Sequence, residues 1–161
     1  MEYAVASSTY YATTSIAEAH VNGQTINSEV VYIDDDGTKA NIGNTNTNFT
    51  GSLVKIGNPD LTGGVFNSFG NFATIVVYGN LKISGNTTIN GIVYVTGETS
   101  FGGGTNTING SLISAGGTSV TDLTGNATIN FDPTVYASWQ DITGLNTTST
   151  ESPRVVGWTE E

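Results

Sequence analysis

The stretches that decide the fold are GNTTING at Gly85–Gly91, GTNTING at Gly104–Gly110 and GNATINF at Gly125–Phe131. Their isoleucines, Ile89, Ile108 and Ile129, lie 19 and 21 residues apart. Self-similarity at a period of about 20 residues is typical of solenoids, in which each repeat buries its apolar face only by stacking on its neighbours. The repeat therefore predicts a chain that completes one coil per unit.

The same plan continues towards the N-terminus. TINSEVVYIDDDG surrounds Ile26, NFTGSLVKIGN surrounds Phe49 and NFATIVVYGN surrounds Phe72, at spacings of 23, 23 and then 17 residues. Together with the three later units, this pattern indicates about six short turns.

Each unit contains a short apolar run, such as Val30–Ile33, Ile75–Tyr78 or Ile92–Val95. Runs of this length, rich in β-branched and aromatic residues, are typical of strands. Gly, Asn, Asp and Ser recur between them, and these residues accept the positive φ angles of tight corners. We therefore expect an all-β fold, a single-stranded parallel β-helix of the usual right-handed crossover sense.

Stacked coils place equivalent strands about 4.8 Å apart, so like residues should form columns along one axis. The predicted apolar column contains Ile89, Ile108 and Ile129, with Phe72 and Phe49 beneath them. Asn90, Asn109 and Asn130 each follow an isoleucine by one residue and should face another direction. Their amides are expected to hydrogen-bond along the axis, as asparagine ladders do in cross-β stacks.

The ends depart from the repeat. Residues 1–22 are expected to form a lead-in or cap, with a short helix in YYATTSIAEAH. Residues 23–135 would form the solenoid and residues 136–161 a C-terminal cap, because open ends expose core and strand edges. The apolar residues offered for that cap are Trp139, Ile142, Leu145, Val155, Val156 and Trp158.

Charge narrows the partners. Only four residues are Lys or Arg against fourteen Asp or Glu, and the formal net charge is −10. Nucleic-acid binding is not expected, because its affinity comes from cations that displace phosphate counterions. An anionic membrane is disfavoured for the same reason, and no run is long and apolar enough for a membrane helix. The polar, lysine-poor composition favours secretion. Cysteine is absent, so disulfides are excluded.

Acidic residues were the first candidates for chemistry. Asp34, Asp35 and Asp36 are consecutive, whereas an EF-hand needs alternating ligands and a terminal glutamate. We interpret them as an exposed acidic turn between coils.

A glycosidase would need two carboxyl groups about 5–10 Å apart on one cleft. The carboxylates Glu29, Glu98, Asp122 and Asp132 fall on different turns. Lyase chemistry would also want cations, and only Lys55 and Lys82 are basic within the repeats.

Other side chains are interpreted as structural. One histidine, His20, cannot by itself form a triad or a zinc site. Tyr3, Tyr10 and Tyr11, with the tryptophans, would give either a carbohydrate-stacking surface or cap core. The sequence therefore predicts no catalytic residue, no metal and no cofactor.

The C-terminal half resembles a known family. LKISGNTTINGIVYVTGETSF, TINGSLISAGG, GNATINFDPTVYASW and the tail RVVGWTEE are similar to the C-terminal region of PilX-like type IV pilus assembly proteins. The resemblance covers about residues 75–161, and Ile129–Val135 is its most telling stretch, with Phe131 where a tyrosine is common. Bactofilins and other β-helical surface proteins use similar turns.

Membership would imply a role in pilus assembly or adhesion, without catalytic residues, behind an N-terminal membrane helix upstream of Met1. The expected function is thus a non-catalytic structural or adhesive module of a bacterial surface fibre. It would be extracellular, with other pilus or surface proteins, a host surface or a glycan as partners. A carbohydrate-active β-helix enzyme is the alternative from another class, and an immunoglobulin-type sandwich is a third that the repeat disfavours.

Overall fold

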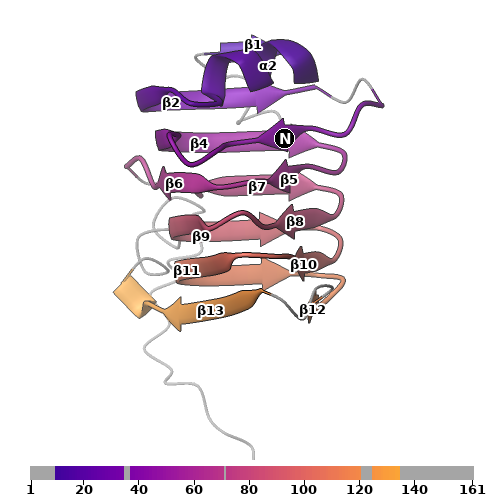
Figure 1. Cartoon of the computed structure of the whole chain (residues 1–161), viewed down its shortest axis with the longest axis vertical. Coiled ribbons are helices and arrows are strands. Elements are labelled where there is room, and N and C mark those ends of the chain that lie inside the picture. Colours follow the sequence, from indigo (N-terminus) through magenta and orange to yellow (C-terminus); the bar gives the residue numbers. More distant parts are fainter. Residues whose placement is uncertain (1–9, 35–36, 71, 121–124, 135–161) are drawn as a thin grey trace, which may run out of the picture.

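Two parallel sheets form the walls of a β-solenoid, as Figure 1 shows. The computed structural model describes residues 10–34, 37–70, 72–120 and 125–134. Every strand pairing in these ranges is parallel, and one short helix completes the secondary structure. The prediction of an all-β parallel solenoid is confirmed.

The first sheet has eight strands. They are β1 (Tyr10–Ala12), β2 (Thr25–Ile33), β4 (Asn48–Ile56), β6 (Gly64–Asn67), β7 (Ile75–Tyr78), β9 (Thr87–Val95), β11 (Thr105–Ser114) and β13 (Asn126–Phe131). Their order is β1-β2-β4-β6-β9-β11-β13, and β7 lies between β4 and β9 beside β6.

The second sheet has five strands and closes each coil. They are β3 (Asn41–Ile42), β5 (Asp60–Leu61), β8 (Leu81–Ile83), β10 (Thr99–Phe101) and β12 (Thr118–Val120). These five strands mark about five complete turns, one fewer than the sequence indicates. The difference arises at the C-terminal end, where β13 begins a turn that no described strand closes.

The core column is continuous from the first turn to the last. Ile26 pairs with Phe49, Phe49 with Phe66, and Phe66 with Ile89. Ile89 pairs with Ile108, and Ile108 with Ile129, as the repeat predicts. The first five members of the column are buried, and they belong to the main hydrophobic cluster.

Phe72 does not join this column, and its predicted place in the ladder is wrong. Phe66 occupies the position, and Phe72 lies in the connection between β6 and β7, where its ring stacks on Phe69 with centroids 6.2 Å apart. The spacing from Phe49 to Phe72 repeats the preceding 23 residues, whereas Phe66 follows after 17. The third coil carries this extra connection within its first wall, and an equal period therefore pointed to the wrong phenylalanine.

Close contact between coils explains the glycine that follows each TIN motif in β9 and β11. Gly91 pairs with Gly110, and both have positive φ angles, 150° and 144°. A Cβ atom at Gly110 would collide with the carbonyl oxygen of Gly91. Only glycine allows both the backbone conformation and the approach of the next coil at this bend.

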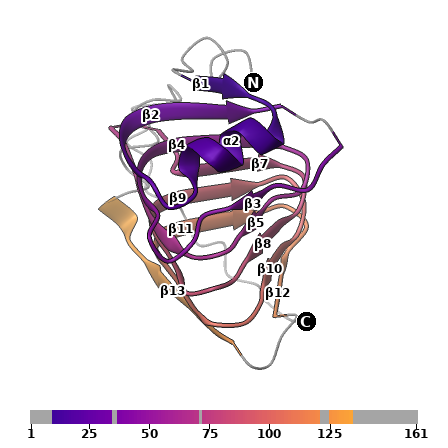
Figure 2. The ribbon, with the colours of Figure 1, turned by 45° about the horizontal axis from the view of Figure 1, so that its top comes forward.

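Helix α2 (Thr14–Val21) lies across the N-terminal end of the solenoid, as Figure 2 shows. Ala17 and Val21 on its inner face are fully buried and belong to the core cluster. The segment predicted as a lead-in therefore contains this helix and also β1, which pairs with β2. The helix covers apolar core that an open end would expose to water.

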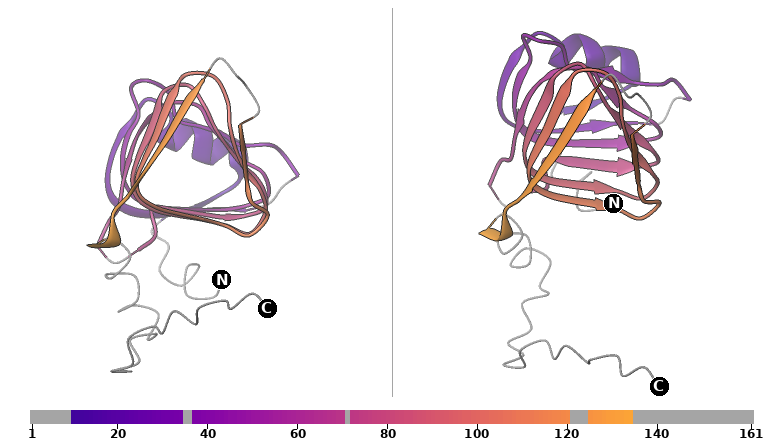
Figure 3. Two further views of the ribbon diagram at one scale, coloured as in Figure 1. Left: turned by 90° about the horizontal axis from the view of Figure 1, so that it is seen from below. Right: turned by 60° about the horizontal axis from the view of Figure 1, so that its bottom comes forward.

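The opposite end is open in the part of the chain that the structure describes. All six residues of β13 are exposed, and Ile129 is 46% exposed although it continues the core column. Figure 3 looks onto this end, with β13 crossing the last coil. The C-terminal cap predicted for residues 136–161 lies outside the described residues.

Candidate functional site

The outer surface of the first sheet carries two columns of small polar side chains. Strands alternate their side chains between faces, so residues on either side of each buried core residue point outwards. We call these twelve residues the Thr/Asn face: Thr25 and Asn27, Asn48 and Thr50, Val65 and Asn67, Thr88 and Asn90, Thr107 and Asn109, and Thr128 and Asn130. All twelve are exposed or half-buried.

Strand geometry fixes the spacing of this face. Neighbouring strands lie about 4.8 Å apart, and outward residues two apart on one strand lie about 6.6 Å apart. Four of the six rungs have the sequence Thr-Ile-Asn, at residues 25–27, 88–90, 107–109 and 128–130. The result is a regular array without a charged side chain.

The asparagine column is linked by side-chain hydrogen bonds. The Nδ2 group of Asn130 donates to Oδ1 of Asn109 (2.8 Å), Asn109 donates to Asn90 (2.8 Å) and Asn90 donates to Asn67 (2.7 Å). The predicted ladder of Asn90, Asn109 and Asn130 thus has a fourth member, Asn67. Sequence reasoning missed it because the third turn was assigned to Phe72.

The threonine column has no comparable internal bonding. The hydroxyl groups of Thr25, Thr88, Thr107 and Thr128 form no hydrogen bond with any other described residue. Each presents a donor, an acceptor and a methyl group outwards. This column can therefore bind a ligand without breaking a contact that stabilises the fold.

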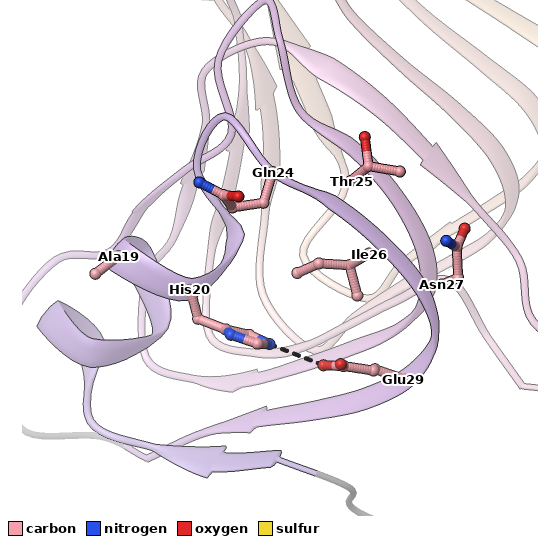
Figure 4. A pocket seen from close by; sticks show the side chains of 7 residues that line it. All are labelled: Ala19, His20, Gln24, Thr25, Ile26, Asn27 and Glu29. Carbon is pink, nitrogen blue, oxygen red and sulfur yellow. Dashed lines mark hydrogen bonds and ion pairs between the residues drawn. The ribbon is translucent and has the colours of Figure 1, made fainter.

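A pocket of about 460 Å³ lies at the N-terminal end of the Thr/Asn face, and Figure 4 shows its lining. Helix α2 contributes Ala19 and His20, and the following segment and β2 contribute Gln24, Thr25, Ile26, Asn27 and Glu29. Two of these residues, Thr25 and Asn27, also form the first rung of the face. The pocket and the array are therefore one continuous polar surface.

His20 and Glu29 pair across this pocket, with Nε2 and Oε2 2.8 Å apart. The ring of Tyr10 stacks on that of His20, with centroids 3.9 Å apart. The register of β2 shifts between Asn27 and Glu29, where Ser28 adopts a φ of 62°. A bulge of this kind re-aims the next side chain, and here it accompanies the turn of Glu29 towards the helix.

The sequence gave no signal for this pair, because nine residues and a change from helix to strand separate its members. The pair can exchange a proton with a ligand. Among the pocket's lining residues there is no second carboxylate and no hydroxyl bonded to the imidazole. The arrangement is suited to holding a polar group.

The other acidic candidates do not converge on this pocket. Glu98 follows β9, which lies three strands along the sheet from β2, a separation of about 14 Å from Glu29. Asp132 follows β13 at the far end, and Asp122 lies outside the described residues. Within the described ranges, no three His, Asp or Glu residues are grouped closely enough to hold a metal ion.

The two lysines of the repeats have separate surroundings. Lys55 is fully buried, and its Nζ donates to Oγ1 of Thr14 (3.1 Å) and to the carbonyl oxygen of Asp34 (3.0 Å). It ties the cap helix to the second coil. Lys82 is half-buried in β8 on the second sheet, so the two cations do not form a joint site.

The tyrosines near the N-terminus contact other elements of the cap. Tyr11 stacks on Tyr32 with ring centroids 5.0 Å apart. A hydrogen bond to Asp34, together with loss of hydration, raises the pKa of Tyr11, and burial raises the pKa of Tyr32. Asp34 is thus committed to contacts within the fold, while Asp35, Asp36 and Tyr3 lie outside the described residues.

No helix among the described residues has the length and apolar character needed to cross a bilayer. A family model described as a domain of unknown function, DUF8470, matches residues 31–126, more than half of the chain. This range begins within β2 and ends at the start of β13, so it spans most of the solenoid. No curated protein and no solved structure matches the chain.

Proposed function

The chain belongs to the DUF8470 family, whose description names no activity, and we propose from its geometry that it is a structural and adhesive module of a bacterial surface fibre. It would act outside the cell, without catalysis, in the manner of the PilX-like pilus proteins that its repeats resemble. Its partners would be other pilus or surface proteins, a host surface or a glycan.

The observation that carries this proposal is the Thr/Asn face. A surface that repeats the same two outward side chains on successive coils presents many equal contacts instead of one reactive centre. Parallel pairing along both sheets holds the coils in fixed register, so the face keeps its spacing along the rod. Six rungs extend over about 24 Å.

Low charge also supports a role in contact with other surfaces. The four basic residues of the chain include the buried Lys55, and Lys39 forms an ion pair with Asp60 (Nζ to Oδ2, 2.8 Å). Recognition of phosphate-rich polymers needs clusters of free cations. A neutral array suits neutral partners.

Immunogold electron microscopy of cells that produce the protein tests its location. We expect gold particles on surface fibres, together with adhesion of beads coated with the purified protein to the surfaces those cells colonise. Beads coated with an unrelated acidic protein are the control. Labelling confined to the cell interior, with no bead adhesion, would contradict the proposal.

A carbohydrate-active enzyme is the second candidate, and the His20–Glu29 pair favours it because the pair lies in a polar pocket. The test is release of reducing sugar from neutral and acidic polysaccharides by the wild type and by Glu29→Gln. Turnover that Glu29→Gln abolishes would establish catalysis and displace the structural proposal. No release by either protein would eliminate the enzyme.

A further inference from the structure

We infer that the Thr/Asn face binds an extended, neutral polysaccharide, with the hydroxyl groups of the threonine column as the main recognition elements. The inference rests on the proposed adhesive function and names its ligand class. It concerns the last three complete Thr-Ile-Asn rungs above all, on β9, β11 and β13, where both columns repeat without interruption.

The threonine column is the feature that internal stability does not explain. Each asparagine of the neighbouring column gains hydrogen bonds from its ladder. The outward threonines gain none, and valine would supply the same β-branched shape and strand preference. Three hydroxyl groups in register on Thr88, Thr107 and Thr128 therefore form an array whose bonding capacity is directed outwards.

The chemistry of the array matches that of a sugar polymer. A polysaccharide presents hydroxyl groups that both donate and accept, separated by patches of C–H groups. Threonine hydroxyls and asparagine amides also donate and accept, and the threonine methyls provide apolar contact between them. Val65, exposed on the third rung, adds a further apolar contact.

Charge selects a neutral polymer over an acidic one. The Thr/Asn face contains no ionisable side chain, and the rest of the chain has a formal net charge of −10. That charge repels uronate or sulfate groups at a distance. Nothing on the face compensates for the repulsion.

Repetition selects a polymer over a single sugar. A lone sugar would meet one or two exposed hydroxyls, each competing with water for a small net gain. A chain that lies along the rungs makes equivalent contacts on each coil, and every contact after the first is intramolecular. The pocket with His20 and Glu29 at the end of the array offers a place for one end of such a chain.

The test compares the wild type with the triple variant Thr88→Val, Thr107→Val and Thr128→Val in sedimentation with insoluble cellulose, chitin and starch. Soluble alginate, in affinity electrophoresis, is the acidic comparison. Thr45→Val with Thr118→Val is the matched control, because these threonines are exposed but lie outside the Thr/Asn face. Circular dichroism and thermal melting check that all three proteins fold alike.

We expect the wild type and the control to bind at least one neutral polysaccharide and not alginate. The triple variant should lose affinity by about tenfold or more, since three hydroxyl contacts are removed together. Equal binding by the triple variant, or no binding of any neutral polysaccharide by the wild type, overturns the inference. Adsorption to ice crystals in place of polysaccharide would also overturn it, because the same array would then bind ordered water.

The outcome can be separated from the proposed function. Gold-labelled fibres and adherent beads, with no retention on any polysaccharide, would leave the adhesive role standing and remove only the ligand class. Should a triple variant fail to fold, the single variant Thr107→Val in the same sedimentation assay replaces it.

Discussion

Asparagine side chains at the corners of the solenoid serve as extra backbone acceptors. Oδ1 of Asn58 accepts from the backbone N–H of Asn80 (2.9 Å), and Oδ1 of Asn80 accepts from that of Glu98 (2.8 Å). Asn86 accepts in the same way from the N–H of Thr105 (2.8 Å). Corners break the regular pairing of backbones, and a buried or half-buried N–H left without a partner is costly. The abundance of asparagine thus has two structural causes, corner bonding and the outer ladder.

The isoleucines of the inner column contribute most per residue to stability. Ile108 is fully buried between Ile89 and Ile129. We expect Ile108→Ala to lower the free energy of unfolding by about 2–5 kcal/mol, because it removes buried apolar atoms and leaves a cavity.

Ile16→Ala is the control for this substitution, because Ile16 on helix α2 is 54% exposed. Its effect should stay within about 0.5 kcal/mol. Urea unfolding followed by circular dichroism measures both values. A loss for Ile108→Ala no larger than that for Ile16→Ala would contradict the stacked core.

Tyr32 makes stability depend on alkaline pH. Burial, followed by the negative charge of Asp34, raises the pKa of this phenol above its ordinary value of 10.0. The unfolded chain therefore loses the proton first as pH rises. The contribution to stability is complete below about pH 10 and is lost as pH rises through the folded-state pKa.

We expect Tyr32→Phe to reduce this alkaline loss of stability, because phenylalanine has no proton to lose. Unfolding free energies of the two proteins at neutral pH and above pH 10 provide the comparison. An identical pH dependence for both proteins would show that Tyr32 is not the responsible group.

At the scale of elements, the cap helix depends on a contact that reaches it from the second coil. Lys55 lies in β4 with its side chain among core residues, and its amine bonds to Thr14 at the start of α2. The carbonyl oxygen of Asp34 accepts a second bond. Within the described residues, no buried side-chain N or O atom is left without a partner.

Replacing this lysine should loosen the cap. We expect Lys55→Met to cost about 1–3 kcal/mol, because the methionine fills the space but leaves buried polar partners unsatisfied. Amide hydrogen exchange of α2 should become faster. Lys39→Met, at a side chain 57% exposed, is the control and should leave that exchange unchanged. Unaltered protection of α2 in Lys55→Met would mean that apolar contacts alone hold the cap.

At the scale of the whole molecule, the two ends of the solenoid are unequal. Helix α2 covers the first coil, whereas β13 pairs only with β11 in the described part of the chain. Each coil of a solenoid contacts only its neighbours, so stability is close to a sum over coils and interfaces. Local opening should therefore start at the C-terminal end.

Native-state hydrogen exchange tests this gradient along the rod. We expect the amides of β13 to exchange fastest and those of β4 to be protected most, since β4 lies between β2 on one side and β6 and β7 on the other. Increasing urea should extend the opening from β13 to β11 before it reaches β4. Equal protection of all strands would instead indicate that the coils unfold as one unit.

The sequence by itself determined the fold class and the register of the regular turns. Ile89, Ile108 and Ile129 stand in identical surroundings, and a strand shifted by one residue would turn each of them outwards into water. Strand alternation then determined that Asn90, Asn109 and Asn130 would share the opposite face. These conclusions depend only on local periodicity, which a sequence contains in full.

Only the tertiary structure decided which residues meet where that periodicity breaks. Phe66 and not Phe72 enters the core because β6 and β7 together fill one rung, and the period alone cannot distinguish a long connection from a new coil. Lys55 enters the interior because the cap brings Thr14 within reach of its amine. His20 meets Glu29 because helix α2 folds back over β2. Each of these contacts depends on how separate elements pack, and so no local pattern encodes it.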